Sequence, residues 1–144
     1  MIHGPNLNML GRREPEVYGR RTLEQIDKLL ADEAARLNLS LKTFQSNHEG
    51  RIVDTIQQAI GQAAGLIINP GAYTHTSIAI RDALLLLDIP MVEVHLSNTY
   101  KREAFRRKST IADIVTGRIV GLGAIGYILA LQAIADMLKD KCLK

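Results

Sequence analysis

Short apolar runs alternate with amphipathic helical patterns along almost the whole chain, and this alternation limits the fold more than any other feature of the sequence. The periodicity predicts helices at 22–38, 51–63, 76–87 and 124–141, and strands at 39–45, 65–69, 91–96 and 118–122. Regular alternation of this kind favours a parallel sheet with helices on both faces. Thr22 and Gln25 have the spacing of a capping box at the start of the first helix.

The chain length and the strand count narrow the fold further. With 144 residues the chain suggests one domain, and five strands in that length match a flavodoxin-like, doubly wound α/β arrangement. We therefore predict a single domain spanning residues 1–144. Its first strand is shortened, because only Met1, Ile2 and His3 precede the turn residues "GPNLN". We expect the short strand to cost stability more than chemistry.

Composition excludes some classes of protein. The one cysteine, Cys142, cannot form an internal disulfide, and no apolar run approaches the ~20 residues that span a bilayer, so the expected location is the cytoplasm with no membrane partner. The net charge is +3, and the dense basic run is "KREAFRRK" at 101–108. That run lacks the interleaved aromatic residues of an RNA-binding sheet. An arginine directed at an anionic small molecule is the favoured interpretation, and no nucleic-acid partner is expected.

The uncommon polar clusters follow three of the predicted strands. They are "HGPNLN" at 3–8, "NPGAYTHTS" at 69–77 and "HLSN" at 95–98. Because ligands of open α/β sheets bind outside the carboxyl ends of the strands, these clusters are predicted to converge on one crevice. His75, Asn69, Ser97 and Asn98 would lie there together with His95.

His95 and Glu93 are two residues apart on a predicted strand, so their side chains share one face. A histidine with a carboxylate neighbour is oriented and made more basic, which suits general acid–base catalysis. The four histidines show no metal-ligand spacing. The segment "GLGAIG" at 121–126 matches a dinucleotide fingerprint, but no later strand follows it, so we interpret it as a tight turn with close helix packing.

Four motifs stand in the order and spacing of one enzyme family: "HGPNLNMLGRREPEVYG", "NPGAYTHTSIAIRDA", "EVHLSN" and "REAFRR". The chain resembles the type II 3-dehydroquinate dehydratases over essentially its whole length. The resemblance implies a flavodoxin-like fold and reversible removal of water from 3-dehydroquinate, through an enolate, to give 3-dehydroshikimate. It implies no metal and no cofactor, a role in aromatic biosynthesis or quinate breakdown, and a homododecamer built as a tetramer of trimers.

The resemblance also implies roles for individual residues. Tyr18 looks like the general base, and Arg13 resembles the residue that keeps this tyrosine ionised. The stretch "GRREPEVYG" between Gly11 and Gly19 would then be a mobile lid. Asn6 would hold the water that stabilises the enolate. His95 resembles the general acid, with Glu93 as its partner. The positions that match substrate-binding residues are Asn69, His75, Asp82, Leu96, Ser97 and Arg106. Asp82 would reach the site of a neighbouring subunit.

Three alternatives stand beside this reading. A lysine Schiff base would give the same product, but the one lysine on a predicted strand near the motifs is Lys42, on the polar face of the second strand, so the enolate route is favoured. A flavodoxin-like nucleotide-binding or regulatory module would carry phosphate-cradling glycines at the first loop instead of "GPNLN". A basic nucleic-acid-binding protein would show steep salt dependence.

Overall fold

The centre of the molecule is a five-stranded sheet in the order β2-β1-β3-β4-β5, and all four strand pairings are parallel. The computed structural model describes residues 1–12, 16 and 19–142. Its strands are β1 (Ile2–His3), β2 (Phe44–Gln45), β3 (Leu66–Asn69), β4 (Met91–His95) and β5 (Gly117–Val120). This strand order is the flavodoxin-like one, so the predicted fold class is confirmed.

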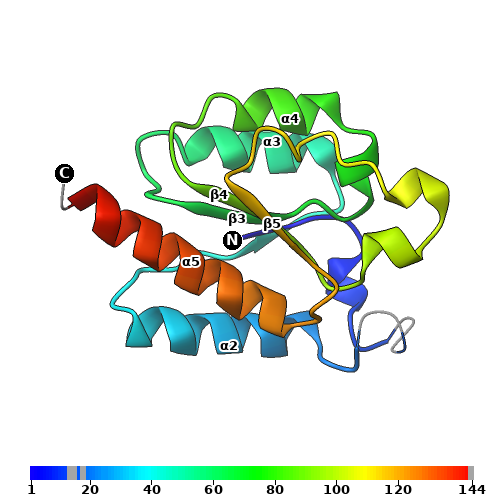
Figure 1. Ribbon diagram of the computed structural model, residues 1–144, viewed down its shortest axis with the longest axis horizontal. Helices are drawn as coiled ribbons and strands as arrows, with labels where there is room; N and C mark the ends of the chain where they lie inside the picture. Colours follow the sequence, from blue (N-terminus) through cyan, green and yellow to red (C-terminus); the bar gives the residue numbers. More distant parts are fainter. Residues whose placement is uncertain (13–15, 17–18, 143–144) are drawn as a thin grey trace.

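Helices cover both faces of the sheet, as the alternating pattern predicted. Figure 1 shows α3 (Glu49–Gln58) and α4 (Ile78–Leu84) on one face, and α2 (Leu23–Arg36) and α5 (Ile125–Cys142) on the other. In the described part of the chain, four 3-10 turns lie in the connections between these elements: η1 (Leu7–Met9), η2 (Gly71–His75), η3 (Thr99–Lys101) and η4 (Ala104–Arg106). All four predicted helices are present, although α3 and α4 end several residues earlier than the periodicity indicated.

Two helix starts are fixed by side-chain caps. The Thr22 hydroxyl accepts a hydrogen bond from the Gln25 amide at 3.3 Å, and the Gln25 side chain accepts one from the Thr22 amide at 3.0 Å. The predicted capping box of α2 is therefore confirmed. Ser77 caps α4 by accepting from the Ile80 amide at 2.9 Å. Each such cap contributes about 1 kcal/mol to helix stability.

Each face of the sheet has its own apolar core. Ile26, Leu30 and Val94 belong to the cluster beneath α2 and α5, which also contains the fully buried ring of Tyr127. The cluster beneath α3 and α4 has at its centre Ile52, Ile56, Ile68, Ile80 and Leu84. The strands β3 and β4 between these layers are buried on both sides, which explains their continuous apolar runs.

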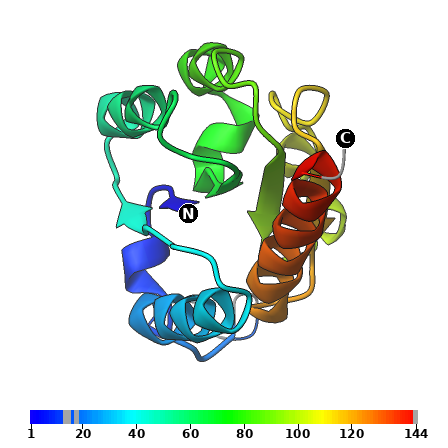
Figure 2. The ribbon, with the colours of Figure 1, turned by 90° about the vertical axis from the view of Figure 1, so that its left-hand side faces the viewer.

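The sheet is incomplete on the side where β1 begins. Only Phe44 and Gln45 of the predicted strand 39–45 pair with β1, because β1 itself contributes two residues to the ladder. The extended segment before them, together with Gly65, Leu66 and Ile134, lines a mainly apolar groove of about 480 Å³. Figure 2 views this end of the molecule, where β1 starts between β2 and the rest of the sheet.

A chain lengthened by a mainly apolar run of four residues before Met1, such as Lys-Ile-Leu-Val, should be markedly more stable to heat. The added residues would continue the parallel ladder along the groove, and each buried aliphatic side chain contributes about 1.5–3 kcal/mol. Two such side chains should raise Tm by on the order of 10 °C, measured by thermal denaturation. A polar extension of equal length is the control. Equal melting temperatures for the two extensions would show that the groove does not accept a strand.

The "GLGAIG" segment forms the predicted turn between β5 and α5. Gly121 has φ of 86°, a left-handed conformation that favours glycine. A Cβ on Gly126 would lie 3.2 Å from the Ile119 side chain, so this glycine permits close packing of α5 on the sheet. The amides of Gly121 and Gly123 donate to the carbonyls of His95 and Leu96 at 3.1 and 3.0 Å. The turn therefore fixes the backbone where β4 ends.

Candidate active site

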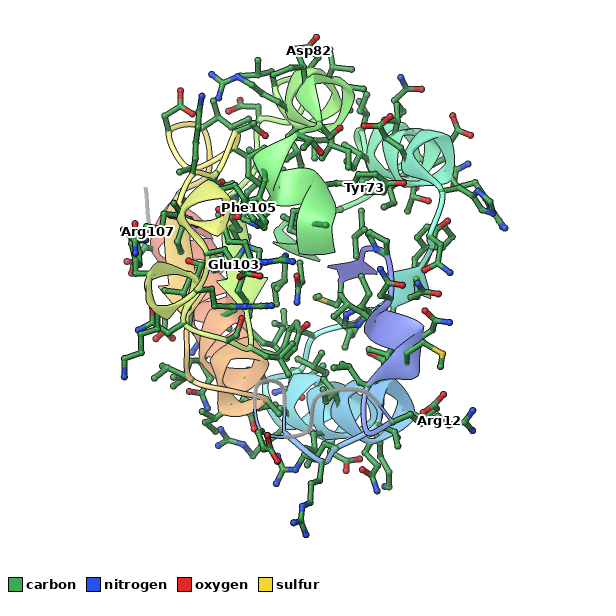
Figure 3. All side chains as sticks on the ribbon, turned by 90° about the vertical axis from the view of Figure 1, so that its right-hand side faces the viewer. Arg12, Tyr73, Asp82, Glu103, Phe105 and Arg107 are labelled. Carbon is green, nitrogen blue, oxygen red and sulfur yellow. The ribbon has the colours of Figure 1, made fainter. Side chains whose placement is uncertain are left out.

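A pocket of about 130 Å³ opens at the carboxyl ends of β1, β3 and β4. The chain leaves β1 and β3 toward opposite edges of the sheet, and such a switch point is where open α/β sheets bind ligands. Figure 3 views this end of the molecule, with η1, η2, η3 and η4 arranged around it. Seven of the residues predicted from sequence line the pocket: Asn6, Asn69, His75, His95, Leu96, Ser97 and Arg106.

The loops after β1 and β3 are locked together beneath the pocket. The Gly4 amide donates to the Asn69 carbonyl at 2.8 Å. A Cβ on Gly4 would lie 2.3 Å from the Pro70 carbonyl oxygen, so another residue there would push the loops apart. Gly71 has φ of 59° and lies against Pro5. The floor of the pocket is therefore built by two segments distant in sequence that pack as one unit.

Asn69 is held by both ends of its amide group. Its nitrogen donates to the Tyr127 hydroxyl at 2.7 Å, and its oxygen accepts from the Gly71 amide at 3.1 Å. Burial raises the pKa of the Tyr127 hydroxyl well above its usual value, so the phenol stays neutral. The two partners fix the orientation of the Asn69 side chain beside the pocket.

His75 presents a neutral imidazole to the pocket. Its Nδ1 lies 2.7 Å from the Lys108 carbonyl oxygen, and since a carbonyl only accepts, Nδ1 carries the hydrogen. Burial lowers the pKa of His75, and the positive charges of His95 and Arg106 lower it further against the effect of that hydrogen bond. The Nε2 atom is therefore left as a hydrogen-bond acceptor.

His95 and Glu93 form the ion pair that their spacing predicted. The His95 Nε2 atom lies 2.7 Å from Glu93 Oε1, and the Glu93 side chain is fully buried behind the imidazole. Glu93 does not line the pocket itself. Burial alone would raise the pKa of the Glu93 carboxyl, but the hydrogen bond and charge of His95, with Thr74 and Arg118, lower it to about 2. Glu93 is therefore ionised at every pH above that value.

The Glu93 contact decides which nitrogen of His95 can serve the pocket. A carboxylate accepts hydrogen bonds, so Nε2 of His95 carries a hydrogen directed at Glu93. In the neutral imidazole the other nitrogen, Nδ1, then has no proton to give. His95 can act as an acid through Nδ1 only as the imidazolium, and the buried Glu93 carboxylate stabilises that form.

Two polar residues that the sequence analysis did not single out lie beside the predicted ones. Thr99 and Arg102 line the pocket, and Arg102 adds a second guanidinium to that of Arg106. The Arg106 Nε atom donates to Glu103 at 3.0 Å, which orients its side chain from η4. The "KREAFRRK" run thus contributes cationic groups to the pocket, as expected for an anionic small-molecule ligand. The local sequence alone does not show that this run lies beside the pocket.

Other predicted residues lie elsewhere. Asp82 is exposed on α4 and points away from the pocket in Figure 3. Asn98 caps η3 by accepting from the Tyr100 amide at 3.0 Å and does not line the pocket. Arg13 and Tyr18 lie outside the described residues. Lys42 lines the groove where β1 begins, at the opposite end of the sheet, which disfavours the Schiff-base alternative.

The backbone at Asn6 takes the left-handed conformation, with φ of 66°. Its amide donates to the Asn47 side chain at 2.9 Å, and the same Asn47 oxygen accepts from Gln45 at 3.1 Å. The loop after β2 therefore supports the loop after β1. Across residues 1–12, 16 and 19–142, no three His, Cys, Asp or Glu side chains gather as they would to hold a metal ion, and no helix is long and apolar enough to cross a membrane.

Comparison with known proteins gives one consistent result. The family model for dehydroquinase class II matches residues 1–135. The 3-dehydroquinate dehydratase of Halothermothrix orenii is 54% identical over 139 residues, covering 96% of this chain and 94% of that protein. Its counterpart from Roseiflexus castenholzii is 57% identical over 132 residues, covering 92% and 84%. The crystal structure of a type II dehydroquinase from Propionibacterium acnes superposes with a TM-score of 0.91 at 43% identity, covering 94% and 93% of the two chains.

Proposed function

This chain belongs to the class II dehydroquinases, and from that premise we propose that it removes water from 3-dehydroquinate to give 3-dehydroshikimate. The observation that carries the proposal is the buried Glu93–His95 pair at the carboxyl end of β4, beside a pocket that contains two asparagines and two arginines. This set supplies an acid, amide groups and positive charge for an anionic substrate. We expect the enzyme to work in the cytoplasm, on the route to aromatic compounds or in quinate breakdown.

The elimination begins with loss of a proton next to a ketone. Tyr18, as the phenolate, takes the proton from C2, and the C–H electrons move into an enolate on the C3 oxygen. Such a proton is weakly acidic, so the developing charge needs a stabiliser. Asn6, at the edge of the pocket, holds the water that donates a hydrogen bond to the enolate oxygen.

The second step expels the C1 hydroxyl. The enolate oxygen re-forms the C3 ketone, the C2–C3 π electrons become the C1–C2 double bond, and the C1–O bond breaks. The His95 imidazolium gives its Nδ1 proton to the departing hydroxyl, which leaves as water. Tyr18 ends protonated and His95 ends neutral, and proton exchange with solvent restores both. The backbone amides of Leu96 and Ser97 receive the substrate carboxylate, while Asn69, His75 and Arg106 bind the rest of the ring.

One assay tests the proposal. Protein treated with a chelator is mixed with 3-dehydroquinate, and the ultraviolet absorbance of the conjugated enone product is followed without added metal or cofactor. The His95→Asn variant, purified in the same way, controls for dehydratase from the host cell. Absorbance should rise with the wild-type chain alone. Equal rates for the two preparations would mean that the activity does not belong to this pocket.

We further propose that the active form is a homo-oligomer, a tetramer of trimers, in which Asp82 reaches a neighbour's site. Asp82 is exposed on α4 beside the apolar side chains of Ile78 and Leu85, each 57% exposed. Uncovered aliphatic groups of this size on one short helix support packing against another copy. Within one subunit, the outward direction of Asp82 keeps it away from the pocket.

Mixing Asp82→Ala subunits with Tyr18→Phe subunits should restore activity that neither variant has alone. If each site takes Tyr18 from one subunit and Asp82 from the next, random exchange gives intact sites in about a quarter of cases. Subunits are mixed under mild denaturant, returned to buffer and assayed, and wild-type subunits treated in the same way are the reference. Failure to regain activity, or full activity in a monomer, would contradict the shared site.

A further inference from the structure

Arg118 reaches the buried carboxylate from the neighbouring strand. In the parallel pairing of β4 with β5, Glu93 and Arg118 are register partners. The Arg118 Nε atom lies 2.5 Å from Glu93 Oε2, and the Arg118 side chain is only 19% exposed. Arg118 does not line the pocket, so it acts on the reaction indirectly, through its contact with Glu93 and through its charge.

The two oxygens of Glu93 have separate partners. Oε1 accepts from His95 Nε2 at 2.7 Å and from the Thr74 hydroxyl, whereas Oε2 accepts from Arg118. Ser109 lies between them, with its hydroxyl 3.1 Å from Oε1 and 3.0 Å from Oε2. This division prevents the carboxylate from turning and places it between the Arg118 guanidinium and the His95 imidazole, of which His95 lines the pocket.

We propose that Arg118 is a positioning residue for the dehydration. It fixes the Glu93 carboxylate and offsets part of its charge, so that the His95 imidazolium can give its proton to the leaving hydroxyl. The inference rests on the proposed role of His95 as proton donor. An isolated buried carboxylate would hold the imidazolium proton tightly. Arg118 competes for that negative charge, so the imidazolium gives up its proton more readily to the leaving hydroxyl.

The other charged groups near the Glu93–His95 pair are the same in the wild-type chain and in the Arg118 variants. They are His75 from η2, Arg102 at the end of η3 and Arg106 from η4. The Oε2 atom of Glu93 accepts from Arg118 and Ser109. A substitution at 118 therefore removes the Arg118 contact and its positive charge from the pair, while the charged residues of the pocket stay the same.

Arg118→Gln removes the charge and keeps much of the volume, and Arg118→Lys keeps the charge without the planar fork. Arg36→Gln is the matched control, because it removes one arginine from the surface of α2, far from the pocket. The His95 imidazole is titrated by NMR in the free enzyme, and the pH profile of kcat/KM is measured for each variant. Thermal melting establishes that all of them fold.

In Arg118→Gln, the midpoint of the His95 titration should rise by roughly 1 pH unit, and the basic limb of kcat/KM should rise with it. Arg118→Lys should move both much less, and Arg36→Gln should leave both unchanged. An unmoved His95 titration, or equal shifts for the glutamine and lysine variants, would overturn the inference. A titration that moves without the basic limb would leave the coupling intact and refute His95 as the proton donor.

Discussion

Replacing His95 with asparagine should lower kcat by about 10²- to 10⁴-fold, with a much smaller change in KM. Asparagine is close to histidine in size and can still donate to Glu93, but it has no proton to transfer to the leaving hydroxyl. The loss should therefore appear in the chemical step, which single-turnover measurements separate from binding and product release. The substitution removes one acid from a pocket whose other residues stay in place.

His48→Asn is the matched control for this prediction. His48 is exposed at the start of α3, and its recorded hydrogen bond to Ser46 uses the backbone amide. Its substitution should leave kcat and KM unchanged. A His95→Asn enzyme with kcat within about threefold of wild type would show that the leaving hydroxyl is protonated by another group, and the Glu93 pair would then serve only to hold β4 in place.

Tyr18→Phe should abolish turnover and leave substrate binding largely intact, because phenylalanine keeps the ring and loses the base. A free tyrosine has a pKa of about 10, so only about one in a thousand is ionised at pH 7. A neighbouring arginine favours the phenolate and can increase the ionised fraction about 10- to 1000-fold. Arg13 is the predicted neighbour. Both residues lie outside the described residues, so their roles and the lid remain predictions from sequence.

The pH profile distinguishes Arg13 from a residue that only binds substrate. A depressed tyrosine pKa means that the active phenolate is lost as pH falls through the lowered value, so Tyr18 controls the acidic limb of kcat/KM. Arg13→Ala should move that limb to higher pH and leave the basic limb unchanged. A uniform loss of rate with both limbs in place would assign Arg13 to substrate positioning instead.

Local patterns were enough to predict the fold and the contact between Glu93 and His95. The strands β3 and β4 are recognisable because they are buried on both sides and read as apolar runs, and Glu93 lies beside His95 because side chains two apart on a strand share a face. The capping box at Thr22 depends on four consecutive residues. The predicted strand 39–45 was too long, because pairing depends on the length of the neighbour, and β1 has two residues in the ladder.

The surroundings of Glu93 could not be predicted, because they depend on contacts between distant segments. Arg118 is 25 residues away and meets Glu93 only through the register of β4 with β5. Thr74 reaches the carboxylate from η2, and Ser109 reaches it from the segment before β5. Nothing in the sequence around Arg118 or Ser109 distinguishes it from an ordinary polar side chain. The position of Arg102 in the pocket could not be predicted either, because it depends on the path of the loop after β4.

The close contact of Gly4 with Pro70 determines how this pocket can change between enzymes. Each of the two loops packs closely against the other, so a loop taken from a relative would fit the second loop of that relative and not the one in this chain. Exchange of residues 3–8 alone, or of residues 69–77 alone, would therefore disrupt this packing. New substrate preferences are therefore easier to reach through the segment after β4, whose arginines line the pocket and are not part of that match.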